Sequence, residues 1–196
     1  MGKLVAIAVV VALLFVVVTG VSGYNNLVKL SESVNQAWSQ VENVYQRRSD
    51  LIPNLVETVK GASNFEQETL TRVIEARASA SQVKITPEML NDPQALQKFD
   101  AAQQQLSGAL SRLLVTVEQY PELKANANYL ALQDELAGTE NRIAVERRRF
   151  TETVQGYNVA VKRFPMNFLA GMFGFQPKAY FEAREGAEEA PKVDFN

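Results

Sequence analysis

The sequence predicts an all-α protein, in which an N-terminal transmembrane helix is followed by a long antiparallel four-helix bundle. Two observations lead to this prediction. Residues 4–21 form an uncharged and almost wholly apolar run. Beyond it, apolar residues recur at alternating spacings of three and four, which is the period of packed helices. Several such helices hide their apolar stripes most simply by packing together as a bundle.

The apolar run has the length of a membrane span. Its eighteen residues would make a helix of roughly 27 Å, close to the thickness of the hydrocarbon core of a bilayer. Lys3 precedes the run and Lys29 is the next charged residue. The excess of positive charge on the cytoplasmic side of membrane proteins favours a cytoplasmic N-terminus. We therefore expect a single-pass protein of the cell membrane, with its bundle in the periplasm or at the cell surface.

A cleaved signal peptide is the competing interpretation, because small residues at 21–23 resemble a cleavage site. The apolar run is longer than the usual core of a signal peptide, which favours a retained anchor. No cysteine follows the run, so a lipoprotein anchor is excluded.

A long run of helical apolar spacing predicts the first bundle helix, and a shorter run predicts the second. The first extends to a stop near Gly61, with an expected kink at Pro53. The second starts at the capping sequence around Ser63 and Asn64 and fades near Val83. The coiled-coil-like seam of the first helix consists of Leu27, Leu30, Val34, Ala37, Val41, Val44, Arg48, Leu51, Leu55 and Val59.

The third and fourth helices follow two proline stops. Asp92 and Pro93 are typical of an N-cap followed by the first helical residue, so the third helix should start there. The fourth is predicted over about residues 122–164. Its length of roughly 64 Å is close to the length of roughly 57 Å of the first helix. If successive helices run away from the membrane and back, the fourth helix would therefore bring Phe164 near the membrane surface.

Four polar residues occupy apolar positions of these seams, namely Arg48, Gln103, Glu140 and Arg147. One interpretation is a buried site, such as an ion-pair relay. The interpretation we favour is a buried polar layer that fixes the register of the helices, since that is the best-attested role of such residues. Glu140 and Arg147 lie two turns apart on one helix, so Arg48 is the more natural partner of Glu140.

The composition argues against several classes of function. The net charge of −2 does not suit a protein that must neutralise nucleic-acid phosphates. The chain has no histidine and no cysteine, which removes the commonest general base and the commonest ligands of transition metals. Sequence motifs of phosphate loops, serine hydrolases, zinc proteases and EF-hands do not occur. We therefore expect no enzyme, no catalytic residue, no metal and no cofactor.

Several segments resemble one family in order along the chain. They are YNNLVKL, AWSQVENVYQRRSDLIPNLVETVKG, EARASA, VEQYPELKANANYLALQDEL, GTENRIAVERRRFTETVQGYN and FPMNFLAGMFGF. This sequence resembles the LemA family over nearly all of residues 24–195. The resemblance implies a membrane-anchored helical bundle without an assigned enzymatic activity. Members are often encoded near membrane metalloproteases or TPM-domain proteins, and a magnetosome-associated branch is linked to membrane remodelling.

An aromatic, uncharged run follows the fourth helix, flanked by Lys162, Arg163 and Lys178. It is too short to span a bilayer. We expect it to lie in the membrane interface with these cations at headgroup level. The alternatives are a segment folded back over the bundle end, or a contact between protomers. The residues predicted to contact the membrane are Phe168, Leu169, Met172, Phe173 and Phe175.

The chain thus divides into an anchor at 1–23, a bundle at 24–164, and a juxtamembrane segment with an acidic tail at 165–196. The predicted function is a membrane-anchored scaffold or interaction protein that self-assembles as a homo-oligomer or shapes the membrane, with the lipid bilayer as a partner. The alternative is an adaptor or regulator of a membrane protease, which family association suggests, with that protease or a TPM-domain protein as the partner. A hydrolase with an unfamiliar site is a remote alternative.

Overall fold

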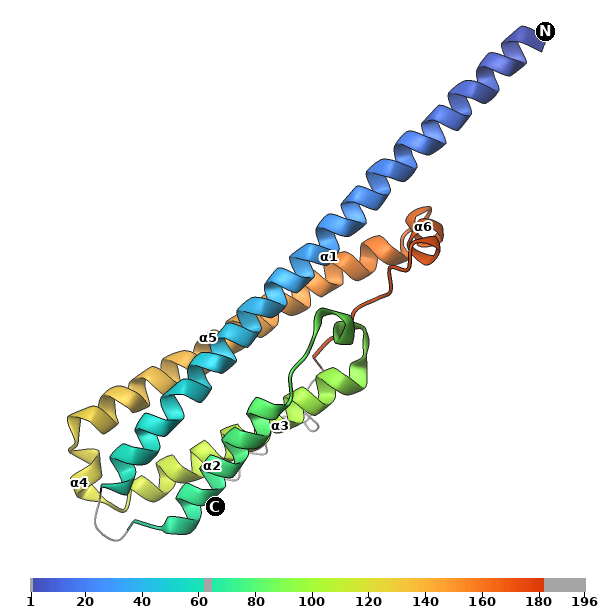
Figure 1. The fold of residues 1–196 in the computed structure, drawn as a ribbon. Helices are drawn as coiled ribbons and strands as arrows, with labels where there is room; N and C mark the ends of the chain where they lie inside the picture. The colour runs from blue at the N-terminus through green and yellow to red at the C-terminus, as the bar shows by residue number, and fades with distance from the viewer. Residues whose placement is uncertain (1, 62–64, 182–196) are drawn as a thin grey trace, which may run out of the picture.

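The fold is a helical rod with one helix projecting far beyond the rest (Figure 1). The computed structural model describes residues 2–61 and 65–181, and over these ranges every regular element is a helix. The elements in chain order are α1 (Gly2–Lys60), α2 (Gln67–Gln82), the 3₁₀ helix η1 (Pro87–Asn91), α3 (Pro93–Val117), α4 (Pro121–Lys124), α5 (Ala127–Lys162) and α6 (Met166–Met172).

Helix α1 joins the predicted anchor and the first bundle helix into one helix of 59 residues. The large apolar residues between Leu4 and Val21 whose side chains are described are exposed, whereas most of the seam from Leu27 onward is buried in the bundle. Pro53 lies within α1 without ending it. In the part of the chain that the structure describes, α1 alone is long and apolar enough to cross a membrane by length and composition.

The bundle consists of two antiparallel pairs of helices. Helix α5 runs back along α1 in the most extensive contact of the molecule, and α2 packs with α3 as the second pair. Successive long helices therefore run in opposite directions, and α5 brings the chain back toward the projecting half of α1 (Figure 1). The predicted all-α class, with an antiparallel four-helix bundle after an apolar N-terminal helix, is confirmed.

Helix boundaries follow local capping chemistry. Asp92 accepts a hydrogen bond from the backbone nitrogen of Gln94 and Pro93 opens α3, as predicted. The predicted start of the second helix at Ser63 and Asn64 lies outside the described residues.

The prediction of one unbroken helix over 122–164 is wrong, because the chain breaks between α4 and α5. There the side-chain oxygen of Asn126 accepts from the backbone nitrogens of Asn128 and Tyr129. Asparagine competes for backbone donors and so starts helices better than it continues them.

The buried apolar side chains form two clusters along the rod. The cluster nearer the apolar half of α1, called membrane-proximal below because that half is the predicted anchor, surrounds Trp38 and includes Phe99 and Phe150. The distal cluster includes Leu55 and Leu106. All the long helices except α2 contribute to both clusters, so the boundary between the two crosses the rod at one level.

Candidate functional site

A polar network fills the boundary between the two apolar clusters. Arg48 of α1 is only 1% exposed. Its Nη1 donates to Glu140 Oε1 of α5 at 2.6 Å and to Ser107 Oγ of α3 at 2.8 Å. Its Nη2 donates to Gln103 Oε1 of α3, also at 2.6 Å. One guanidinium therefore joins three helices, using the several donors that its planar fork offers.

A second network lies beside the first on the membrane-proximal side. Arg147 donates to Asp100 Oδ1 at 2.5 Å and to the hydroxyl of Tyr45 at 3.2 Å. Its guanidinium also lies 4.0 Å from the centre of the Phe181 ring. Burial raises the pKa of the Tyr45 hydroxyl, whose oxygen accepts the hydrogen bond from Arg147. Again α1, α3 and α5 are linked through one arginine.

The four polar residues singled out in the sequence thus fall into two neighbouring networks. Arg48, Gln103 and Glu140 share the first, and Arg147 belongs to the second. Glu140 was predicted to be buried, but 47% of its side chain is exposed. It reaches Arg48 from the edge of the bundle, where water still solvates part of the carboxylate and lowers the cost of desolvation.

Asp100 escaped the sequence analysis, although it is the acidic partner of Arg147. It lies next to Phe99 and outside the seam of three- and four-residue spacings, so the apolar pattern gives no signal for it. Only the packing of α3 against α5 brings it to Arg147.

The chemistry of this region suits the pairing of helices. A groove of about 330 Å³ lies along the two networks, lined among others by Arg48, Gln103, Glu140 and Arg147. Both arginines carry a carboxylate partner. Among the described residues, no three acidic side chains gather in a way that would hold a metal ion. The networks can hold three helices in one register.

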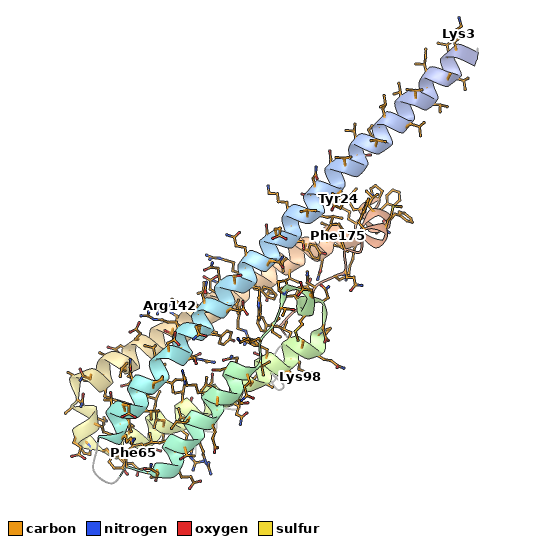
Figure 2. The ribbon with its side chains drawn as sticks, in the orientation of Figure 1. Lys3, Tyr24, Phe65, Lys98, Arg142 and Phe175 are labelled. Carbon is orange, nitrogen blue, oxygen red and sulfur yellow. The ribbon has the colours of Figure 1, made fainter. Side chains whose placement is uncertain are left out.

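A second candidate site lies where the chain leaves the apolar half of α1. Helix α6 crosses α1 at Gly23, where an added Cβ would overlap the side chain of Met166. Glycine at this position leaves room for the flexible end of the Met166 side chain. Tyr24 packs edge-on against the rings of Phe173 and Phe175, with centroids 5.0 and 5.7 Å apart. Figure 2 shows Tyr24 and Phe175 side by side at this junction.

The five residues predicted to contact the membrane are divided by this packing. Phe168, Met172 and Phe173 are exposed by 67, 75 and 53%. Leu169 is half-buried and faces α1. Phe175 turns toward the bundle and packs against the membrane-proximal cluster, so it does not belong to the exposed face.

Lys178 also departs from its predicted place at headgroup level. It donates to the backbone oxygen of Pro87 at 3.3 Å, and burial lowers the pKa of its amine. The flanking cations that remain exposed are Lys162 and Arg163.

Residues 175–181 form a strap that returns along the bundle. Asn158 of α5 holds it by two hydrogen bonds, to the backbone nitrogen and oxygen of Lys178 at 2.8 and 2.9 Å. The backbone nitrogen of Ala179 donates to Leu90 of η1 at 2.8 Å. At its end, the ring of Phe181 packs against Trp38 and Phe150. The strap thus folds back along the bundle, while α6 lies at the end of the rod from which the apolar half of α1 projects (Figure 1).

Comparison with known proteins gives the family. The family model of LemA matches residues 37–195, which is most of the chain and includes both polar networks and α6. The chain belongs to the LemA family. Its match begins inside α1, beyond Gly23 and Tyr24, and so covers most of the bundle, α6 and the strap.

Characterised relatives include magnetosome proteins. The chain is 26% identical over 181 residues to magnetosome proteins MamQ 1 and MamQ 2 of Paramagnetospirillum magneticum, an alignment that covers 84% of this chain and 66% of each relative. It is 26% identical over 195 residues to magnetosome protein MamQ of Magnetospirillum gryphiswaldense, covering 91% of this chain and 72% of that one. Protein LemA of Metamycoplasma hominis is 24% identical over 161 residues, with 82 and 69% covered. This LemA-family chain thus spans slightly less than two thirds of the two Paramagnetospirillum proteins.

Proposed function

We propose that this LemA-family chain is a single-pass, non-catalytic scaffold whose helical rod stands on the outer surface of the cell membrane. The observation behind the proposal is the continuity of α1. Because its exposed apolar half and its buried seam belong to one helix, the anchor and the rod move as one body. A rigid rod of this kind displays its surface at a set distance from the bilayer.

Charge and relatives support this arrangement. Lys3 lies before the apolar run and Lys29 lies after it, and the positive-inside rule places the end next to Lys3 in the cytoplasm. The similarity to proteins named for the magnetosome supports a structural role at a membrane.

Self-assembly is the scaffold activity that we propose. The apolar half of α1 presents valines, leucines and one phenylalanine on all its sides within the described residues, with the small residues Ala6 and Ala8 among them. Small residues allow transmembrane helices to approach one another closely. Anchors that pair in the bilayer would bring their rods together. Within each rod, the ion pairs of Arg48 and Arg147 hold the helices in register.

The test is the mass of the full-length protein in mild detergent, beside a chain that starts at Tyr24. A discrete assembly that needs the first 23 residues supports a scaffold held by its anchors. If both chains are monomers, self-assembly is refuted. Co-purification of a stoichiometric membrane protease with a monomeric full-length chain would favour the adaptor function in its place.

A further inference from the structure

The surface beside α6 is the largest apolar feature outside the bundle core that the proposed scaffold leaves unused. Phe164, Phe168, Met172 and Phe173 are large apolar residues that stay exposed around this short helix. Soluble surfaces seldom gather so many large apolar side chains without a partner. The question is what covers them.

A cleft between α1 and α6 gives the first indication. It has a volume of about 360 Å³ and is lined by Val17, Gly20, Val21, Tyr24, Leu169 and Phe173. Four of these residues come from α1, and three of the four belong to the run of eighteen apolar residues. The cleft is therefore continuous with the surface that faces lipid once α1 is in a bilayer.

The height of the cleft along α1 gives the second indication. Eighteen residues of helix measure roughly 27 Å and just fill the hydrocarbon core. Val17 and Gly20 then lie within the outer leaflet, and Tyr24 lies at its surface, where tyrosine is favoured. Since Leu169 and Phe173 line the cleft with them, α6 is held at that same depth.

The charges around α6 fit this depth as well. From Phe164 to Pro177 the chain carries no charged residue, while Lys162 and Arg163 at the end of α5 are exposed. Basic side chains beside an apolar interfacial segment reach lipid headgroups with their charged ends while their stems stay in the apolar region.

We propose that α6 is a wedge in the outer leaflet and that the cleft between α6 and α1 holds an acyl chain of a membrane lipid. This inference rests on the proposed anchoring of α1. It assigns Phe168, Met172 and Phe173 to lipid contact, with Leu169 and Gly20 as the two walls of the cleft. The bilayer then holds the rod at two points, α1 and α6, which fixes its tilt.

The experiment is quenching of tryptophan fluorescence by lipids brominated on their acyl chains. The full-length protein is reconstituted into such vesicles with a reporter at Phe168→Trp or Phe173→Trp. Val18→Trp on the exposed part of α1 reports the anchor, and Ile74→Trp on the exposed face of α2 is the matched control outside the membrane. The native Trp38 is buried in the bundle and gives a constant background.

We expect quenching at Val18→Trp, Phe168→Trp and Phe173→Trp, and none at Ile74→Trp. Quenching at Val18→Trp without quenching at the two α6 reporters overturns the wedge and leaves the anchor intact. If Val18→Trp also escapes quenching, the anchoring itself is wrong. If the α6 reporters are shielded and Phe168→Cys cross-links two copies, the face is a protein interface and the lipid assignment is refuted.

Gly20→Leu tests the cleft itself. An added Cβ at Gly20 meets no atom within 4 Å, so leucine can enter the cleft without moving the backbone and displace the acyl chain. We expect quenching of Phe173→Trp to fall in the Gly20→Leu background while quenching of Phe168→Trp, which is not among the residues that line the cleft, persists. Unchanged quenching of Phe173→Trp would show that no acyl chain occupies the cleft.

Discussion

Arg48 of α1 donates to Glu140 of α5 over 2.6 Å, at the level where one apolar cluster of the core ends and the other begins. The pair is unequal, because the arginine is almost completely buried while half of the glutamate side chain lies in water. Arg48 therefore depends on Glu140 more strongly than Glu140 depends on Arg48.

Arg48→Ala should lower the free energy of unfolding by about 3 kcal/mol, since it leaves a cavity and removes the centre of a buried network. Glu140→Ala should also cost about 3 kcal/mol, because it leaves the buried Arg48 guanidinium without a carboxylate even though its bonds to Gln103 and Ser107 remain. Chemical denaturation of the full-length chain in detergent, followed by circular dichroism, measures both. Arg72→Ala, which breaks an exposed pair with Glu68, is the control and should change little. A cost at position 140 as small as that of the control would contradict this account.

Glu42→Gln should stabilise the protein at pH 7 and give a smaller gain at pH 4. The Glu42 side chain is exposed overall, but partial burial of its carboxyl raises the carboxyl's pKa above 4.5, although the hydrogen bond with Trp38 and the charge of Lys84 oppose the shift. The folded state thus favours the protonated form, and its contribution to stability is lost as the pH rises from about 4.5 through the folded pKa. Thermal unfolding at the two pH values tests this. Glu152→Gln, at an exposed position of α5, is the control, and an equal gain at both pH values for Glu42→Gln would refute the effect.

Asn158→Ala should free the strap while leaving the bundle folded. The Asn158 amide makes both hydrogen bonds to the backbone of Lys178, and its loss should cost about 1–3 kcal/mol locally. Amide hydrogen exchange should then speed up in residues 176–181 but not in α3. Gln155→Ala changes an exposed residue of the same helix and should leave the exchange of the strap unaltered.

Gly23→Leu should detach α6 from α1. Alanine at this position overlaps only the flexible end of the Met166 side chain, which can move aside, so Gly23→Ala should be mild. A leucine side chain is too large for this adjustment, so Gly23→Leu should raise the hydrogen-exchange rate of the α6 amides in vesicles. Gly138→Leu is the matched control, because an added Cβ there meets no atom within 4 Å. If α6 stays protected in Gly23→Leu, Gly23 is not what allows its docking.

The helical pattern and the capping residues were readable in the sequence because both depend on local spacing. The seams of α1 and α3, the start of α3 at Asp92, and the apolar run of α1 follow from this. The break at Asn126 was missed, since it depends on the capping hydrogen bonds of the Asn126 side chain and the predicted apolar seam begins only at Tyr129. Local spacing also identified the polar residues at apolar positions of the seams, namely Arg48, Gln103, Glu140 and Arg147.

The sequence by itself thus determined the all-α fold, the apolar half of α1 and the polar positions within the seams, because periodicity decides which residues share a helix face. Only the tertiary structure decided which partners meet. It paired Arg147 with Asp100, left Glu140 at the edge of the bundle, turned Phe175 inward and placed α6 against Gly23. These contacts join residues up to 150 positions apart in the chain, so they depend on how whole helices pack and leave no local signal in the sequence.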